Sequence, residues 1–191
     1  MRRRTFDALV STAGLLLAVL LGVGGGLLIW GSSFVNDQVH TQLAAQKIYF
    51  PPAGSEAIKT LPSTDATAMT AYAGQLMTNG AQAQAYADHF IAVHLREIGG
   101  GKTYAQLASA SLAQPKNTAL AAQVQTIFRG ETLRGLLLNA YAFWKVAQIM
   151  MIAAIVAFIG CGLMLILSGL GFWHLRRTPP EAELGKPAST S

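Results

Sequence analysis

The sequence is poor in cysteine and in charge. Its single cysteine, Cys161, cannot form a disulfide within the chain, so the fold has no covalent cross-link of this kind. Charged residues make up 12% of the 191 residues, roughly half the usual share in a soluble domain, whereas 52% are hydrophobic. This composition does not favour an ordinary soluble domain.

Carboxylates are especially scarce between residues 31 and 145. The six acidic residues there are Asp37, Glu56, Asp65, Asp88, Glu97 and Glu131. No two of them are three or four positions apart, so no helix presents a carboxylate pair on one face. No serine is placed beside a base, and Cys161 lies in an apolar run. We therefore predict that the protein is not an enzyme and has no cofactor.

The formal net charge of +5 comes mainly from the two ends of the sequence. Between residues 31 and 144 the chain has seven basic and six acidic residues, so this segment is close to neutral. A nucleic-acid site needs a concentrated basic patch, whereas arginines next to apolar runs are typical of the cytoplasmic side of a membrane. Nucleic acid is therefore excluded as the expected partner.

Two apolar runs, residues 8–30 and 146–173, are both bordered by arginines. A bilayer core is crossed by ~20 apolar helical residues, so each run is long enough to span it. Because Lys and Arg stay on the cytoplasmic side, both tails, residues 1–7 and 174–191, are expected there. Residues 31–145 then form an extracytoplasmic domain of a protein in the cytoplasmic membrane.

A cleaved signal peptide is the alternative interpretation of the first run. Hydrophobic regions of signal peptides have about 7–15 residues, whereas this run has 23. Aromatic residues also border both runs, with Trp30 and Phe34 after the first, and Phe143 and Trp144 before the second. Such rings are typical of the lipid headgroup region, which favours a retained anchor.

The segment between the spans has helical patterns and no convincing alternation of period two. Residues 33–47 and 117–145 are expected to continue the two spans as long antiparallel stalks. Helices are also predicted over residues 65–78, 81–98 and 103–113, the last opened by a capping box of Thr103 and Gln106. Residues 55–64 are predicted to be a loop. The predicted fold is all-α, a small extracytoplasmic helical bundle on two transmembrane helices.

Motifs that resemble metal or nucleotide sites are incomplete. His94 with Glu97, and Asp37 with His40, have helical spacing, but zinc needs three or four converging ligands. Residues 99–103 read Gly-Gly-Gly-Lys-Thr, yet position 96, where a phosphate-binding loop needs its first glycine, is Arg96. We predict no metal site and interpret the glycines as a helix end.

Residues 128–135, just before the second span, form the densest polar segment. Glu131 and Arg134 are one helical turn apart and can pair. Gly130 and Gly135 are each unfavourable inside a helix, by about 1 kcal/mol, which predicts that a neighbouring segment approaches the backbone there. From the rise of 1.5 Å per residue we also expect Lys47 or Gln46 to face Glu131 across the stalks. The candidate interaction residues are Tyr49, Phe50, Arg129, Glu131 and Arg134.

Several strings resemble a family of uncharacterised actinobacterial membrane proteins. They are residues 39–43, 49–52, 86–90, 99–104 and 128–135, within a resemblance that covers most of residues 30–175. Some members of that family are labelled as a subunit of aromatic ring-opening dioxygenases, which bind non-haem iron through histidines and a carboxylate. The resemblance implies a location in the actinobacterial envelope and supplies no activity.

Two functions are compatible with these patterns. The first is a non-enzymatic interaction module whose partner is an envelope protein or a second copy in a homodimer, with the apolar turn at residues 48–52 as the expected exposed contact. The second is an extracytoplasmic small-molecule sensor or an accessory subunit of a transporter. A pocket among Tyr49, Tyr86, Phe90, Tyr104 and Phe128 that binds a small apolar molecule would favour this second function.

Overall fold

The structure is a computed structural model that describes residues 3–177. Its elements are α1 (Arg3–Ala45), α2 (Glu56–Lys59), α3 (Ser63–Thr70), α4 (Gly80–Tyr86), the π-helical segment η1 (Ala87–Ile91), α5 (Ala92–Ile98), α6 (Tyr104–Ala113) and α7 (Thr118–Arg177). Within residues 3–177 there is no β-strand, only an isolated bridge between Tyr49 and Leu76. The all-helical class predicted from the sequence is therefore confirmed.

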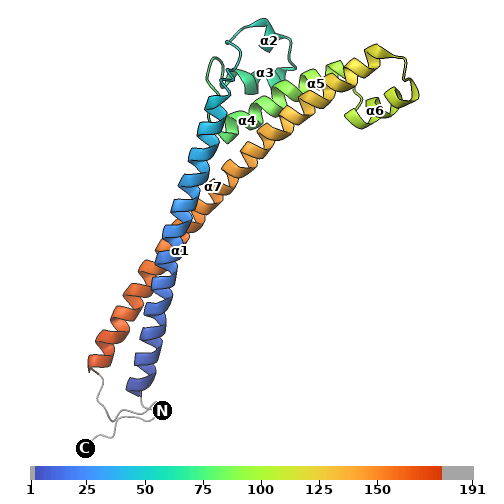
Figure 1. The fold of residues 1–191 in the computed structure, drawn as a ribbon. Coiled ribbons are helices and arrows are strands. Elements are labelled where there is room, and N and C mark those ends of the chain that lie inside the picture. Colours follow the sequence, from blue (N-terminus) through green and yellow to red (C-terminus); the bar gives the residue numbers. More distant parts are fainter. Residues whose placement is uncertain (1–2, 178–191) are drawn as a thin grey trace, which may run out of the picture. The chain divides into compact units, whose positions relative to one another are not determined.

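The chain divides into two compact units (Figure 1). In the described part of the chain, unit 1 consists of residues 3–32 and 148–177, and unit 2 is Ser33–Ala147. Helices α1 and α7 run without interruption over 43 and 60 residues, so each contributes to both units. The prediction that each apolar run continues as a long helix is therefore confirmed.

Both long helices are long and apolar enough to cross a membrane. Only 11% of the most apolar window of α1 and 6% of that of α7 is buried within the protein. A core helix of a soluble protein is instead mostly covered by other elements of its own chain. The most apolar segments of α1 and α7 are therefore not covered by the rest of the protein, unlike a core helix of a soluble domain.

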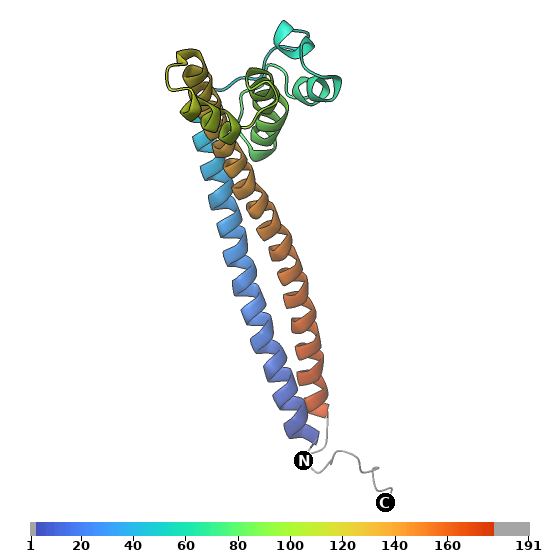
Figure 2. The same ribbon diagram turned by 90° about the vertical axis from the view of Figure 1, so that its right-hand side faces the viewer.

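In unit 1, small residues on α1 pack against α7. Gly14 lies opposite Ser168, and Ser11 lies opposite Gly171, so each helix places a hydroxyl against a glycine of the other. Further along, Gly25 lies opposite Phe158. The partners on α7 move toward its N-terminus as the positions on α1 advance, so the two helices run in opposite directions within this unit (Figures 1 and 2).

Unit 2 has a conventional apolar core. The largest fully buried side chains are Phe50, Met69, Met77, Ile127 and Leu137. Helices α4, η1 and α5 follow one another along α7 (Figure 1). Leu95 of α5 packs on Gly130 of α7, and Gly80 of α4 packs on Trp144 of α7. A neighbouring segment does approach the backbone at Gly130, as the sequence predicts. The same prediction is wrong for Gly135, which faces open space.

Helix ends in unit 2 follow the capping signals in part. The Thr103 hydroxyl accepts from the backbone N–H of Gln106, and the Gln106 side chain accepts from the N–H of Thr103, which confirms the capping box. The predicted helix over residues 65–78 is wrong at its end, because α3 stops at Thr70. Gly74, at φ 73°, follows in a turn. Residues 55–64, predicted as a loop, contain the short helix α2.

Candidate functional site

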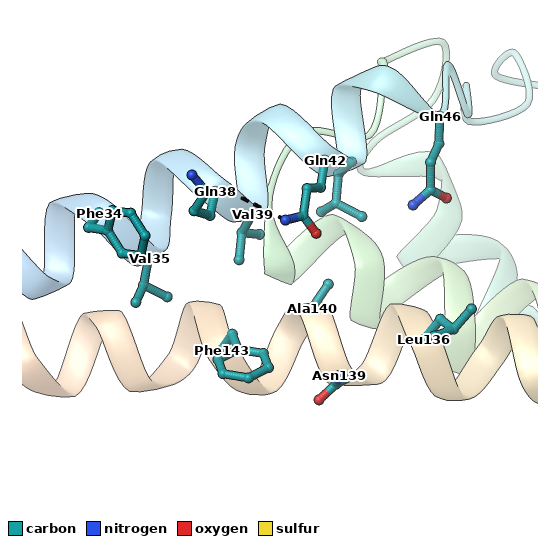
Figure 3. A pocket seen from close by; sticks show the side chains of 11 residues that line it. Phe34, Val35, Gln38, Val39, Gln42, Gln46, Leu136, Asn139, Ala140 and Phe143 are labelled. Carbon is teal, nitrogen blue, oxygen red and sulfur yellow. Dashed lines mark hydrogen bonds between the residues drawn. The ribbon is translucent and has the colours of Figure 1, made fainter.

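A groove in unit 2 lies between α1 and α7 (Figure 3). It has a volume of about 380 Å³ and is open to the surface. Its walls are Phe34, Val35, Gln38, Val39, Gln42, Leu43 and Gln46 from α1, and Leu136, Asn139, Ala140 and Phe143 from α7. The groove is therefore built from the two segments that directly follow and precede the apolar runs.

The groove combines exposed apolar side chains with neutral amides. Phe34, Leu136 and Phe143 are each more than half exposed. Gln42 and Gln46 extend from α1 toward α7 in Figure 3, and the Gln42 amide donates to the Gln38 carbonyl oxygen at 3.4 Å. No charged side chain is among the described residues that line the groove. Such a surface suits a neutral ligand that offers both apolar contacts and hydrogen-bonding groups.

The turn after α1 differs from the expected contact surface. Tyr49 is exposed, but Phe50 is 1% exposed and belongs to the core of unit 2. The expectation that Phe50 lies on an exposed contact is wrong. The backbone N–H of Phe50 donates to the Gln75 carbonyl at 2.9 Å, and this pairing turns the ring inward.

Phe50 begins a continuous row of aromatic contacts in unit 2. Its ring centroid is 5.3 Å from that of Tyr86, Tyr86 is 4.9 Å from Phe90, and Phe90 is 4.5 Å from His94. Burial of the Tyr86 phenol raises its pKa above 10.0, because the charged phenolate loses hydration. The row is a packed core element of unit 2.

One pocket among five aromatic residues would have favoured the sensor hypothesis, but the structure separates these residues. Tyr86 and Phe90 belong to the partly buried aromatic row, whereas Tyr104 contacts Phe128 in a separate pair with a centroid distance of 5.6 Å. Tyr49 lies exposed at the bridge to Leu76. No described pocket is lined by all five residues.

The charged residues of the 128–135 segment form a short ion-pair network. Arg134 pairs with Glu131 at 3.5 Å, as the helical spacing predicts, and with Asp88 at 3.0 Å. The second contact joins α7 to η1. Helical spacing does not predict this contact, because the two residues are 46 positions apart. Arg129 is exposed on the same helix.

The expected meeting of Lys47 or Gln46 with Glu131 is wrong. Gln46 lines the groove with Leu136 and Asn139, whereas Glu131 lines a different pocket together with residues of α5 and the loop before α6. Estimating heights from helical rise placed the α1–α7 contact roughly one and a half to two turns too far toward the N-terminus of α7. The estimate ignored the bundle helices that occupy this part of α7.

The π-helical turn η1 was missed in the sequence, where residues 81–98 read as one regular helix. Such a turn contains one extra residue and shifts the side chains that follow it around the helix axis. Asp88, in η1, reaches Arg134, while His89 places Nδ1 2.7 Å from the Asp65 carboxylate of α3. The two neighbouring side chains thus join η1 to two different helices.

The histidines do not gather into a metal site. His94 places Nδ1 2.7 Å from the carbonyl oxygen of Phe90 in its own helix, and so does not share the Asp65 contact of His89. Within residues 3–177, no three side chains of His, Cys, Asp or Glu come together as potential ligands of one ion.

Comparison of the chain with protein-family models, with curated proteins and with solved structures gives no match to any of the three. The geometry of the chain is therefore the basis for assigning a function. A signal for the groove was present in the sequence. Gln38, Gln42 and Gln46 recur every four residues beside an apolar stripe, which places three amides on one face of a helix.

Proposed function

We propose that the protein is an integral membrane protein with two spans, whose unit 2 binds a helical segment of an envelope protein through the α1–α7 groove. In this proposal both termini are cytoplasmic and unit 2 is extracytoplasmic. The segments of α1 and α7 beyond the spans serve as antiparallel stalks. The protein performs no chemical reaction.

The surface of unit 1 supports the membrane assignment. Its exposed side chains are large and apolar, such as Leu20 at 69% and Ile166 at 62% exposure, whereas Ser11 and Ser168 are buried. In water this arrangement exposes a large apolar area without compensation. In lipid it is favourable, because hydrocarbon solvates the outer face and the small residues let the two helices pack closely.

The groove is the main support for a binding module. It is an exposed apolar surface on unit 2, whose own core is buried as in a water-soluble domain. A groove between two helices accepts the side-chain ridge of a third helix. The lack of charge among the described lining residues favours a neutral helix with small or apolar residues and amides, because an ionised side chain would lose hydration without a partner.

The direct test is site-specific photo-crosslinking in native membranes, with a photoreactive residue at Gln42 in the groove. The matched control is Gln125, an exposed glutamine on α7 outside the groove. We expect Gln42 to yield a defined adduct with another envelope protein and Gln125 to yield none. Replacing Gln42 by Glu places a charge in the groove and should weaken the complex at least tenfold, whereas Gln125→Glu should not.

Other outcomes separate the alternatives. A photo-adduct with twice the mass of the chain would show that a second copy of this chain occupies the groove. The groove would then be a dimerisation surface. Equal adducts from Gln42 and Gln125, or none from either in membranes that contain the whole envelope, would contradict the groove as the binding surface.

The alternative function, an extracytoplasmic small-molecule sensor or a transporter accessory subunit, is supported by the size of the same groove. Its volume of about 380 Å³ lies within the range of ligand pockets, roughly 300–1,000 Å³. This function predicts that a small neutral molecule raises the Tm of the protein and that Phe143→Ala abolishes the shift. A protein adduct at Gln42 with no small-molecule effect would exclude it.

A further inference from the structure

A second pocket of unit 2 lies on a different part of α7, between α7, α5 and the start of α6. Its volume is about 260 Å³. Its walls are Ala92, Leu95, Arg96, Gly101, Lys102, Thr103, Ile127, Glu131 and Arg134. Three of these side chains are cations and one is an anion, so the pocket is positive, in contrast to the neutral groove.

The cations of this pocket are not equivalent. Arg134 is already engaged by Asp88 and Glu131, at 3.0 and 3.5 Å. Arg96 and Lys102 are exposed and have no ion-pair partner within residues 3–177. The pocket therefore has two uncompensated cations beside a third that is fixed in place.

Side chains, and not backbone amides, provide the donors of the loop. The N–H groups of Gly101 and Lys102 donate to the carbonyls of Arg96 and Gly99, at 2.9 and 3.1 Å, and that of Thr103 donates to the Gln106 side chain. A phosphate-binding loop needs free amides, so the Gly-Gly-Gly-Lys-Thr string does not act as one. Its fold instead brings Lys102 into the same pocket as Arg96.

We propose that this pocket binds a small anion of the phosphate or carboxylate class, held by the side chains of Arg96 and Lys102. Arg134 supplies a fixed positive charge at the wall. Guanidinium and ammonium groups form charge-assisted hydrogen bonds with such oxyanions, and these bonds are stronger than those between neutral groups. The site is separate from the groove, and its test does not depend on the proposed function.

Glu131 opposes the anion, because its carboxylate lines the same pocket. A like charge in the pocket lowers the affinity for an anion, so binding should be weak in the native protein. Replacing Glu131 by Gln removes the repulsion between its carboxylate and the bound anion. It also removes the ion pair between Glu131 and Arg134, whose N–O distance is 3.5 Å. The variant should therefore bind the anion more tightly than the native protein.

The experiment is isothermal titration of the full chain with inorganic phosphate at low ionic strength, in maltoside micelles that contain no phosphate. The double variant Arg96→Gln and Lys102→Gln should bind at least tenfold more weakly, because each loses a charged hydrogen bond. Glu131→Gln should bind several-fold more tightly. The control is Arg129→Gln with Lys116→Gln, which removes the same charge from two exposed positions outside the pocket.

Unchanged binding in the Arg96 and Lys102 variant, an equal loss in the control, or no binding to the native protein or to Glu131→Gln would overturn the proposal. Adding phosphatidylglycerol to the micelles identifies the natural source of the anion. If the lipid suppresses phosphate binding in the native protein, a lipid headgroup occupies the site. If phosphate binds equally well with the lipid present, the ligand is a soluble anion.

Discussion

Units 1 and 2 use the same residue types in opposite ways. In unit 2 large apolar side chains such as Ile127 and Leu137 are buried, and charged residues lie at the surface. In unit 1 the buried residues include Ser11, Ser168 and Ala154, whereas leucines and isoleucines cover the outside. One chain thus has two burial patterns, and that of unit 1 is the pattern expected of the membrane-spanning unit proposed above.

The difference shows what stabilises each unit. Burying an apolar side chain away from water stabilises unit 2 through the hydrophobic effect. Between two helices in lipid this effect is absent, and close packing of small residues replaces it. With unit 1 in a membrane, as we propose, the paired contacts of Ser11 with Gly171 and of Ser168 with Gly14 are the counterpart of the apolar core of unit 2.

The largest expected effect comes from truncating one isoleucine in each unit. Ile127→Ala should destabilise the protein by about 2–5 kcal/mol, because it removes a core side chain that is 2% exposed. Ile152→Ala, on the exposed face of α7 in unit 1, should change stability by less than about 0.5 kcal/mol. Denaturant unfolding of the full chain in micelles measures both; equal losses would contradict the comparison.

The second-largest expected effect is on membrane insertion, and it comes from placing a carboxylate on the exposed face of each unit. Leu20→Asp should disfavour membrane insertion by about 3 kcal/mol, since Leu20 is near the middle of the first apolar run. Leu112→Asp changes a residue that is 84% exposed in unit 2 and should have no effect on insertion. The measurement is the fraction of each protein that resists alkaline extraction from membranes.

Two glycines of α7 test the close approach within unit 2. Gly130→Ala should destabilise by about 1–3 kcal/mol, because the added methyl group meets the buried Leu95 side chain. Gly135→Ala has open space around the new methyl group and should stabilise the helix by about 1 kcal/mol. Thermal unfolding of the two variants should therefore shift in opposite directions; a shift of the same sign would refute the packing at Gly130.

The smallest effect is the pH dependence from Tyr86. Its pKa is raised above 10.0 in the folded protein, so the fold favours the neutral phenol. The contribution of Tyr86 to the free energy of unfolding is fully present below pH 10. It is lost as the pH rises through the pKa of Tyr86 in the folded protein. Tyr86→Phe should reduce the loss of stability above pH 10, measured by unfolding at a series of pH values. An unchanged loss would show that burial of Tyr86 does not contribute.

Local patterns in the sequence were sufficient to predict the long helices, the capping box at Thr103 and the pairing of Glu131 with Arg134. Each of these depends on residues within one or two helical turns, where spacing determines the geometry. The two apolar runs were equally clear, because hydrocarbon imposes a length and a composition on any helix that crosses it.

Features that depend on distant contacts were not predictable from these patterns. Phe50 follows a stretch that reads as an exposed turn, and its burial depends on hydrogen bonding to Gln75 and on ring contact with Tyr86. Asp88, which pairs with Arg134, lies in the π-helical turn, and no residue type in that segment predicts such a turn. The glutamines of α1 indicate only one wall of the groove, and its other wall belongs to a helix almost a hundred residues away in the sequence.

The central claim, two spans with unit 2 on the outer side, is tested most directly by cysteine accessibility in intact cells. Cys161 is first replaced by Ser, and single cysteines are introduced at Leu112 in unit 2 and at Thr5 near the N-terminus. We predict that a membrane-impermeant maleimide labels the Leu112 position in intact cells and the Thr5 position only after lysis. Labelling of Thr5 from outside, with Leu112 protected until lysis, would contradict the account.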